Sequence, residues 1–150
     1  AIKYHDQKEL GEFLGLQYAS ELRNTQAVEQ VDVIVPVPLH ESKLRSRGYN
    51  QSEWFAKGLA AGLNKAVDCN SLRRSKATST QTRKRKYERW ENVEGIFELG
   101  DPAGLEGRHC LLVDDVITTG ATIEAAWLAI RQATGATISV MSIAFASKAA

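Results

Sequence analysis

Two aspartates and three threonines lie within nine residues toward the end of the sequence. The stretch reads Asp114-Asp115-Val116-Ile117-Thr118-Thr119-Gly120-Ala121-Thr122, and it follows the apolar run Cys110–Val113. A helix is predicted directly after it, because Ile123, Ala126 and Ile130 recur at helical spacing. The N-terminus of a helix presents unpaired N–H groups and the positive end of the helix dipole, so the stretch is typical of a phosphate-binding loop.

The residue types within this stretch suit two different groups of one ligand. Gly120 allows the backbone to approach a phosphate closely, and the threonine hydroxyls add hydrogen-bond donors. Asp114 and Asp115 only accept hydrogen bonds when they are ionised, so they would repel a phosphate but receive bonds from sugar hydroxyls. The order of the two parts predicts a ligand that carries a ribose next to its 5′-phosphate.

Two other nucleotide-binding patterns are excluded by the sequence. The magnesium-binding strand of P-loop NTPases requires a GxxxxGK[ST] stretch upstream, and a dinucleotide fold requires GxGxxG; neither occurs in the chain. A plainer alternative is a solvated acidic strand end followed by an ordinary threonine cap on the next helix. The length of the whole string favours the phosphate site over that alternative.

The elements that must position these residues are strands that alternate with helices. The β-branched run Val31–Val35 predicts a strand that ends at two prolines, and Cys110–Val113 and Thr137–Phe145 predict further strands. Helices are predicted from about Asp6 to Leu22 and from about Asn50 to Leu63. Apolar strands that alternate with helices indicate an α/β domain in which helices flank a mostly parallel central sheet.

The predicted helices bury faces of mainly large apolar side chains. These are Leu10, Phe13, Leu14 and Leu22 in the first helix, Trp54, Phe55, Leu59 and Leu63 in the second, and Ile123, Ala126, Trp127 and Ile130 in the helix that closes near Gly135. This spacing places Trp127 in the core rather than against a ligand.

A loop rich in lysine, arginine, serine and glycine is predicted from Leu39 to Tyr49. The positive charges of Lys43, Arg45 and Arg47 could bind an anionic group, for which the planar fork of arginine is well suited, and Gly48 permits a tight backbone. The alternative is a solvated surface loop with scattered charges. Asn50 and Gln51 could also cap the helix that follows.

The composition describes an ordinary globular domain. The chain has 150 residues, 43% of them hydrophobic and 25% charged, and a net charge of +1. No apolar run is long enough for a membrane-spanning helix and no secretory signal is visible, so a cytoplasmic protein is expected. The chain begins with Ala1 rather than Met, which indicates a fragment or a processed form.

The cysteines and histidines show no pattern of a metal site. Cys69 and Cys110 are too few and too far apart for a disulfide framework or a zinc knuckle, and Cys110 is predicted to be an inert thiol buried in a strand. His5, His40 and His109 lack metal-ligand spacing and are expected to be structural or exposed.

The charge is strongly segregated along the chain. The segment from Arg73 to Arg89 contains eight basic residues and one acidic residue, Glu88, and so has a net charge of +7 in seventeen residues. The rest of the chain carries eleven basic and seventeen acidic residues, a net charge of −6. The near-zero total therefore conceals a basic segment on an acidic body, and an anionic ligand is expected.

The string from Asp114 to Thr122 resembles the loop of the type I phosphoribosyltransferases that binds 5-phosphoribosyl 1-pyrophosphate (PRPP). The resemblance implies that Asp114 and Asp115 hold the ribose hydroxyls and that Thr118, Thr119, Gly120, Ala121 and Thr122 bind the 5′-phosphate. It also implies a pyrophosphate site in the loop after the first strand, at Lys43, Arg45, Arg47 and Gly48. Mg²⁺ would be held mainly by pyrophosphate, ribose hydroxyls and water, with no direct protein metal site expected.

Further segments resemble the ComF branch of this family, the competence-protein homologues also described as amidophosphoribosyltransferase-like. These are Pro36–His40, Leu44–Gln51, Thr80–Thr82, Arg89–Phe97 and the Lys3-Tyr4 opening, so that the match covers essentially the whole chain. Many members of the branch carry an N-terminal cysteine-rich zinc segment that this sequence lacks. One phosphoribosyltransferase-like domain over residues 1–150 is therefore expected.

The basic stretch from Leu72 to Trp90 is predicted to be a mobile loop and has three interpretations. The resemblance implies a flexible loop that closes over PRPP, carrying Arg83, Lys84, Arg85, Lys86 and Arg89. The same residues could contact nucleic acid, with Tyr87 and Trp90 available to stack on bases. The third interpretation is a disordered, solvated segment.

Two functions follow from the sequence. The first is a Mg²⁺-dependent phosphoribosyltransferase, whose acceptor and catalytic base the residues do not identify. The second is a non-catalytic module of the same fold that acts in DNA uptake and competence and binds a nucleotide or single-stranded DNA. Resemblance to the type I enzymes also implies a homodimer.

Overall fold

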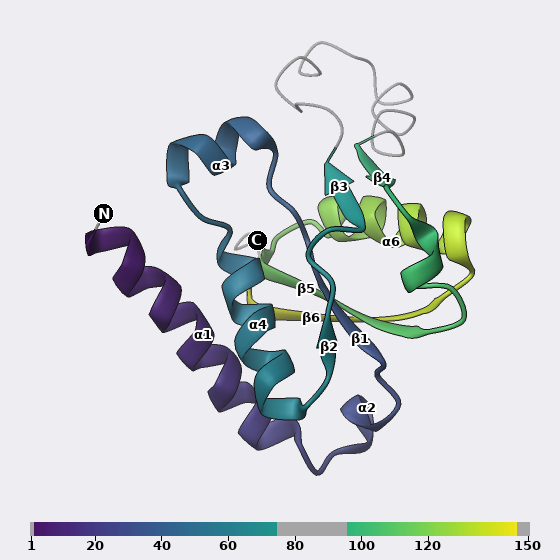
Figure 1. The fold of residues 1–150 in the computed structure, drawn as a ribbon, viewed down its shortest axis with the longest axis horizontal. Coiled ribbons are helices and arrows are strands. Elements are labelled where there is room, and N and C mark those ends of the chain that lie inside the picture. The colour runs from purple at the N-terminus through teal and green to yellow at the C-terminus, as the bar shows by residue number, and fades with distance from the viewer. Residues whose placement is uncertain (1, 75–95, 147–150) are drawn as a thin grey trace.

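The computed structural model describes the backbone of residues 2–74 and 96–146 and the side chains of residues 6–74 and 96–146. A parallel four-stranded sheet, with strand order β2-β1-β5-β6, forms the centre of this part of the chain (Figure 1). The strands are β1 (Val33–Pro36), β2 (Ala66–Val67), β5 (His109–Ile117) and β6 (Thr137–Phe145). Helices cover both faces, so the predicted α/β fold with a parallel sheet flanked by helices is confirmed.

Helix α4 (Gln51–Leu63) covers one face of the sheet, and α1 (Ile2–Leu22) packs on the outside of α4 (Figure 1). Phe55 and Leu59 of α4 are fully buried in a cluster that includes Ile34 of β1. Tyr18 of α1 meets Phe55 edge to face, with ring centroids 5.4 Å apart. Burial of these large apolar side chains is the main stabilising contribution on this face.

The contact between α1 and α4 depends on two glycines. A Cβ atom on Gly58 would lie 2.0 Å from the carbonyl oxygen of Glu12, and one on Gly15 would lie 2.3 Å from that of Phe55. The backbones of α1 and α4 are therefore in direct contact at these two glycines.

The face predicted for α1 is partly wrong. Leu10 and Phe13 are 56% and 54% exposed, whereas Leu14 and Leu22 are partly buried against the core as expected. The close approach of α4 requires small residues on the contacting face of α1. The prediction was based on large apolar side chains and therefore did not detect this face.

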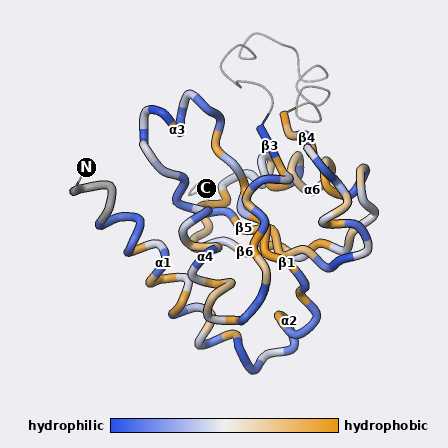
Figure 2. The backbone as a smooth tube through the Cα atoms, in the orientation of Figure 1, coloured by the Kyte–Doolittle hydropathy of each residue, from blue (hydrophilic) through white to orange (hydrophobic). Residues whose placement is uncertain are grey.

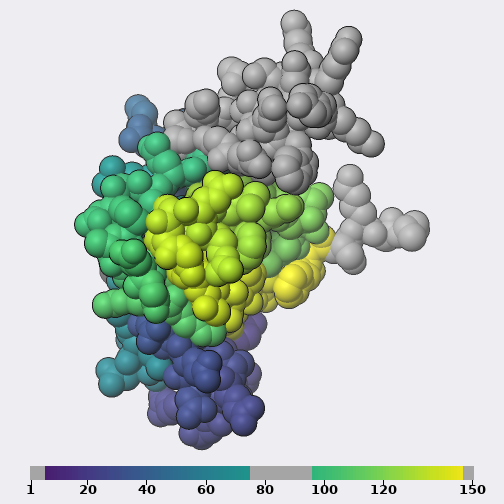
Figure 3. Space-filling model, turned by 90° about the vertical axis from the view of Figure 1, so that its right-hand side faces the viewer, coloured from purple at the N-terminus to yellow at the C-terminus, as the bar shows by residue number. Residues whose placement is uncertain are grey.

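Helix α6 (Ala121–Thr134) and a small hairpin cover the other face of the sheet. The hairpin pairs β3 (Leu72–Arg74) with β4 (Phe97–Leu99) in antiparallel register, and a short 3₁₀ helix, η2 (Pro102–Gly104), follows it. Figure 3 shows α6 on this side of the molecule, in green to yellow.

Trp127 of α6 is not in the core as predicted. Its neighbours Ala125 and Ala126 are buried at 1% and 0% exposure, whereas Trp127 is 37% exposed. The helix turns Ala125, Ala126 and Ile130 toward the sheet, so Trp127 lies at the flank of the contact.

The loop predicted from Leu39 to Tyr49 contains a helix, α3 (Glu41–Arg47). His40 caps it by accepting a hydrogen bond at Nδ1 from the Ser42 amide (3.1 Å), and Gly48 ends it with φ 84°. No residue of α3 is buried, and Figure 2 shows this segment as predominantly hydrophilic. Without an apolar face the helix has no periodic sequence signal.

Other boundaries were predicted more closely. The last strand, Thr137–Phe145, is confirmed at both ends, and Asn50 caps α4 by accepting a hydrogen bond from the Ser52 amide (3.1 Å). Leu72–Arg74, expected within a mobile loop, forms β3, while the remainder of the basic stretch lies in residues 75–95, outside the described residues. A short helix, α2 (Gln26–Glu29), has no counterpart among the predictions.

His109 and Cys110 have structural surroundings. His109 hydrogen-bonds Ser139 Oγ through Nε2 (2.7 Å), and Cys110 is fully buried, where desolvation raises its pKa to about 11. The buried position predicted for Cys110 is confirmed. Among the helices in the described ranges, none has the length and apolar character needed to cross a bilayer.

We expect Gly58→Ala to destabilise the fold by about 2 kcal/mol, because the new methyl group must push α1 away from α4. The better helix propensity of alanine offsets only part of this cost. Urea unfolding followed by circular dichroism measures the change. Gly104→Ala is the control, since its nearest non-neighbouring atom would be 3.8 Å from the new Cβ. Equal stability of Gly58→Ala and the wild type would contradict the close helix contact.

Candidate functional site

The parallel pairing of β1 and β5 brings the ends of both strands to one edge of the sheet. Pro36 of β1 pairs with Val113 of β5, so the segments that follow these residues lie next to each other. A cavity of about 450 Å³ opens at this edge and is lined from both segments and from the start of α4. We call it the strand-end cavity. The carboxyl ends of parallel strands are where ligand crevices form in open α/β sheets.

Asp114 and Asp115 line the strand-end cavity from within β5 rather than from a loop. The strand continues to Ile117, and Asp114 pairs with Ser142 of β6. Ser52 at the start of α4 donates a hydrogen bond from Oγ to Asp114 Oδ1 at 3.3 Å, and the Asp115 amide donates to the same oxygen at 2.9 Å. The ladder with β6 therefore fixes the backbone that carries the acidic pair.

The surroundings of Asp114 favour its neutral form. Desolvation is the main cause that raises its pKa to about 6, and the neighbouring Asp115 raises it further. The amide of Asp115 and the hydroxyl of Ser52 act in the opposite direction. A cation or a hydrogen-bond donor that enters the cavity would stabilise the ionised form.

The threonine-rich loop joins β5 directly to α6. Gly120 adopts φ 84° as the N-cap, and the Ala121 amide donates to Thr119 Oγ1 at 3.3 Å. Thr118 and Thr122 line the strand-end cavity, and the loop itself encloses a further hollow of about 40 Å³. The hydroxyls and the first turn of α6 thus lie together beside the acidic pair, as an anion-binding helix N-terminus requires.

The structure brings two of the predicted basic residues to the cavity. Lys43 and Arg47 of α3 line it, whereas Arg45 does not and instead forms an exposed ion pair with Glu41 at 3.7 Å. Gly48 ends α3 in the left-handed conformation. The five residues predicted for the flexible basic loop, Arg83, Lys84, Arg85, Lys86 and Arg89, lie outside the described residues.

Arg74 was not singled out by the sequence, yet it lines the strand-end cavity from the end of β3. Its guanidinium carbon lies 5.4 Å from the centroid of the Phe97 ring. Burial lowers the pKa of Arg74, and the charge of Asp114 counteracts this effect. In sequence Arg74 is one of eight basic residues in a run, and only the pairing of β3 with β4 distinguishes it.

Two polar residues at the N-terminus of α4, the N-cap Asn50 and Ser52, were also missed as parts of the site. Asn50 is 8% exposed and donates from Nδ2 to the carbonyl oxygen of Val37 at 3.1 Å, and Ser52 is 3% exposed. Asn50 thereby joins the α4 N-terminus to the segment after β1. Its position before an apolar helix was a detectable capping signal, but the contact with Val37 was not.

The donor set suits a ligand that carries hydroxyls and phosphates. Carboxylates on one wall accept from hydroxyls, and the threonine loop and cationic side chains bind anionic oxygens. In the ranges 6–74 and 96–146, no group of three or more His, Cys, Asp or Glu side chains could hold a metal ion. The acidic pair nevertheless fits Mg²⁺, which commonly uses one or two carboxylates together with substrate phosphates and water.

A parallel α/β sheet with an acidic pair at a strand end and a Thr-Thr-Gly loop before the next helix is the arrangement of a type I phosphoribosyltransferase domain. Residues 9–150 match the family model described as the phosphoribosyl transferase domain. The chain belongs to this family, in its ComF-like branch.

Two curated relatives place the chain within the branch. It is 36% identical over 115 residues to the DNA utilization protein YhgH of Escherichia coli K12. This match covers 76% of the present chain and 50% of the relative. It is 33% identical over 104 residues to Competence protein F of Haemophilus influenzae, in a match that covers 69% of the present chain and 45% of the relative. The chain therefore spans about half the length of these relatives.

A solved structure supports the same fold. The glutamine PRPP amidotransferase from B. subtilis superposes with a TM-score of 0.59 at 22% identity, over 93% of this chain and 26% of that one. The likeness extends across almost the whole chain and concerns the fold.

We expect Asp114→Asn to remove a pH-dependent loss of stability. The carboxyl has an ordinary pKa of 3.8 and a pKa of about 6 in the folded protein, so the folded state holds its proton more tightly than the unfolded chain. The stability that this proton contributes is fully present below the unfolded pKa and is lost as the pH rises through the folded pKa. Thermal unfolding from about pH 4 to about pH 7 measures the difference.

The control for this experiment is Asp6→Asn, which removes one carboxylate from an exposed position on α1. The melting temperature of the wild type should fall relative to that of Asp114→Asn as the pH rises. A constant difference between the melting temperatures of the wild type and Asp114→Asn over this pH range would show that folding does not raise the pKa of Asp114.

Proposed function

We propose that this domain binds PRPP together with Mg²⁺ in the strand-end cavity and transfers its 5-phosphoribosyl group. The observation that carries the proposal is the convergence on one cavity of the acidic pair, the threonine-rich loop and three cationic side chains, Lys43, Arg47 and Arg74. Each group matches a different part of PRPP. Membership of the phosphoribosyl transferase domain family supports the same ligand.

Each part of PRPP would have a partner in or beside the cavity. The ribose hydroxyls would donate to Asp114 and Asp115, and the 5′-phosphate would accept from the loop of Thr118, Thr119, Gly120, Ala121 and Thr122. The pyrophosphate would bind Lys43, Arg47 and Arg74, with Gly48 allowing α3 to end beside it. Arg45, which lies away from the cavity, contributes positive potential only.

The proposed transfer breaks the bond between ribose C1 and the pyrophosphate oxygen while an acceptor forms a new bond to C1. The bonding electrons leave with pyrophosphate, so Lys43, Arg47 and Arg74 would stabilise the charge that develops there. Asp114 and Asp115 would hold the ribose in position for the attack. When bound, Mg²⁺ supplies neutralising charge at the phosphate oxygens, held by the ligand, water and the acidic pair.

We expect the double variant Asp114→Asn/Asp115→Asn to lose the thermal stabilisation that Mg²⁺-PRPP gives the wild-type chain. The amides cannot accept hydroxyl hydrogen bonds with the strength of carboxylates. Differential scanning fluorimetry with Mg²⁺-PRPP measures the shift. The matched control is Asp6→Asn/Glu21→Gln, which removes two exposed carboxylates from α1. A wild-type chain that millimolar Mg²⁺-PRPP does not stabilise would overturn the proposed ligand.

Transfer itself is tested by release of pyrophosphate from PRPP in the presence of a panel of nucleobases and amines. An acceptor that raises the release rate in the wild type, but not in the double variant, establishes the reaction and the acceptor class. Binding of PRPP without release for any acceptor would leave a binding module rather than an enzyme.

A second candidate is a non-catalytic module that binds single-stranded DNA through the basic segment between Arg73 and Arg89. The printed names of the relatives, a DNA utilization protein and a competence protein, favour it, as does the +7 charge of the segment. Binding of DNA by this segment does not exclude a ligand in the strand-end cavity, although Arg74 belongs to both the segment and the cavity.

We expect single-stranded DNA to bind with a steep salt dependence that depends on Arg83, Lys84, Arg85 and Lys86. Replacing all four with Ala should reduce the slope of log K against log salt by about 3, because each lost phosphate contact contributes about 0.7. Fluorescence anisotropy over a salt series measures the slope. Arg45→Ala/Arg108→Ala, which removes two exposed cations elsewhere, is the control and should leave the slope unchanged. A flat salt response of the wild type would count against DNA binding.

A further inference from the structure

A serine hydroxyl of α4 reaches the acidic pair from a different element of the fold. Ser52 lies in the first turn of α4 and is 3% exposed. Its Oγ donates to Asp114 Oδ1 at 3.3 Å, although the two residues are 62 positions apart in sequence. A serine hydroxyl in a helix commonly points to solvent or donates to the carbonyl oxygen four residues earlier. A bond to a carboxylate on the neighbouring sheet therefore indicates a tertiary role.

The position of Ser52 is itself fixed. Its amide donates to Asn50 Oδ1 at 3.1 Å, and Asn50 Nδ2 donates to the carbonyl oxygen of Val37 at 3.1 Å. Phe55, in the next turn of α4, is fully buried in the core between α4 and the sheet. The hydroxyl is thus presented by a helix end that is tied to the segment after β1 and packed on the sheet. A group held in this way is preorganised before a ligand arrives.

Asp114 receives two hydrogen bonds at one of its carboxylate oxygens. The Asp115 amide donates to Oδ1 at 2.9 Å, and Ser52 Oγ donates to the same atom. Each carboxylate oxygen accepts about two hydrogen bonds, so acceptor capacity for a ligand hydroxyl is left on Oδ2. The amide bond is local to the strand. The bond from Ser52 ties the carboxylate to a second element and so restricts its rotation.

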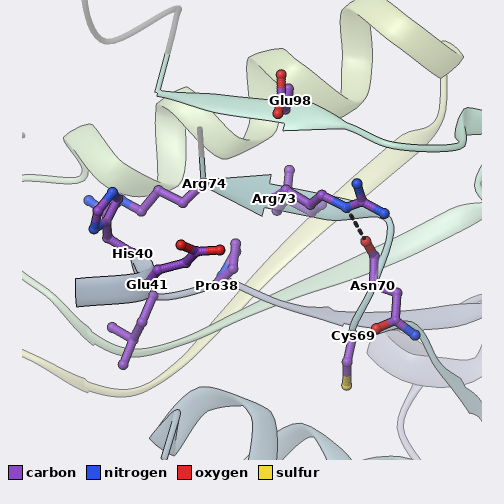
Figure 4. Close-up of a pocket in the computed structure, with 10 residues that line it drawn as sticks. Pro38, His40, Glu41, Cys69, Asn70, Arg73, Arg74 and Glu98 are labelled. Atoms are coloured by element: carbon purple, nitrogen blue, oxygen red, sulfur yellow. Dashed lines mark hydrogen bonds between the residues drawn. The ribbon is translucent and has the colours of Figure 1, made fainter. Parts of the chain in front are cut away.

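Arg74 is a cationic neighbour of Asp114, yet it does not orient the carboxylate. Figure 4 shows the Arg74 side chain directed toward His40 and Glu41. The influence of Asp114 on Arg74 is one of charge. A charge interaction depends only weakly on the rotation of a carboxylate, whereas a hydrogen bond is directional. The orientation of Asp114 therefore comes from the Ser52 hydroxyl and the Asp115 amide.

We propose that Ser52 is a positioning residue for the ribose of the ligand. Through its bond to Asp114 Oδ1 it holds the carboxylate in the orientation in which Oδ2 accepts a ribose hydroxyl. This inference rests on the proposed function, because it requires the ribose of PRPP to lie against the acidic pair. Without the Ser52 hydroxyl the carboxylate rotates more freely, and the cost of fixing it reduces the affinity for the ligand. The effect is confined to the ribose half of the site.

The experiment measures the dissociation constants of Mg²⁺-PRPP and Mg²⁺-pyrophosphate by calorimetry for the wild type and Ser52→Ala. The variant should bind PRPP about 10-fold more weakly, since a hydrogen bond to a charged group is lost. Its affinity for pyrophosphate, which has no ribose, should be unchanged. Ser52→Thr keeps a hydroxyl and should restore the affinity for PRPP.

The matched control is Ser139→Ala. It removes a hydroxyl that also bonds one side chain, His109 Nε2 at 2.7 Å, where β5 begins and away from the strand-end cavity. It should change neither dissociation constant. Thermal unfolding of each variant checks that it folds. If Ser52→Ala does not fold, Ser52→Cys takes its place, because a thiol fills similar space but is only a weak donor.

Three results would overturn the positioning role. They are a PRPP affinity that Ser52→Ala leaves unchanged, an equal loss of affinity for PRPP and pyrophosphate, and a folded Ser52→Thr that binds PRPP as weakly as Ser52→Ala. In each case the wild type still binds PRPP, so the proposed function stands and only this inference fails. A wild type that does not bind Mg²⁺-PRPP overturns the proposed function and this inference together.

Discussion

The parallel pairing of β1 with β5 is the constraint on which the rest of the site depends. The register that sets Val33 against Cys110 and Pro36 against Val113 makes both strands end at the same edge of the sheet. Most of the strand-end cavity follows from that alignment, and Arg74 is added from the β3–β4 hairpin. The α3 segment leaves one strand, and the acidic pair and the threonine loop belong to the other. Ser52 and Asn50 then join α4 to both, through Asp114 and through the Val37 carbonyl.

Charged groups at this edge of the sheet are held in unfavourable surroundings. Two carboxylates stand next to each other, partly removed from water, and desolvation raises the pKa of Asp114 to about 6. Nearby, burial disfavours the charged form of Arg74, and its buried Nε has no partner in the described part of the chain. Groups held away from their preferred state are typical of functional sites, because a ligand with matching charge relieves the penalty.

Much of this organisation could be predicted because its signals are local. Asp114 to Thr122 form one continuous stretch of strand, turn and helix start, so residue type and spacing together predict a sugar-phosphate site. The alternation of strands and helices likewise predicts the parallel α/β sheet. The contact face of α1 could not be read in the same way, because Gly15 and Gly58 bring two backbones together without any large apolar side chain. Trp127 illustrates the reverse error, since helical spacing alone does not say which residue meets the sheet.

By itself the sequence determined the fold class and the family. The first is encoded in the alternation of apolar strands with helices, and the second in motifs of consecutive residues. Only the tertiary structure decided which basic residues belong to the cavity. Arg74 and Asp114 are forty residues apart in sequence, and Arg45 differs from Lys43 and Arg47 only by its direction on one short helix. Such choices depend on strand pairing and helix orientation, which minimise the free energy of the whole chain rather than that of any local segment.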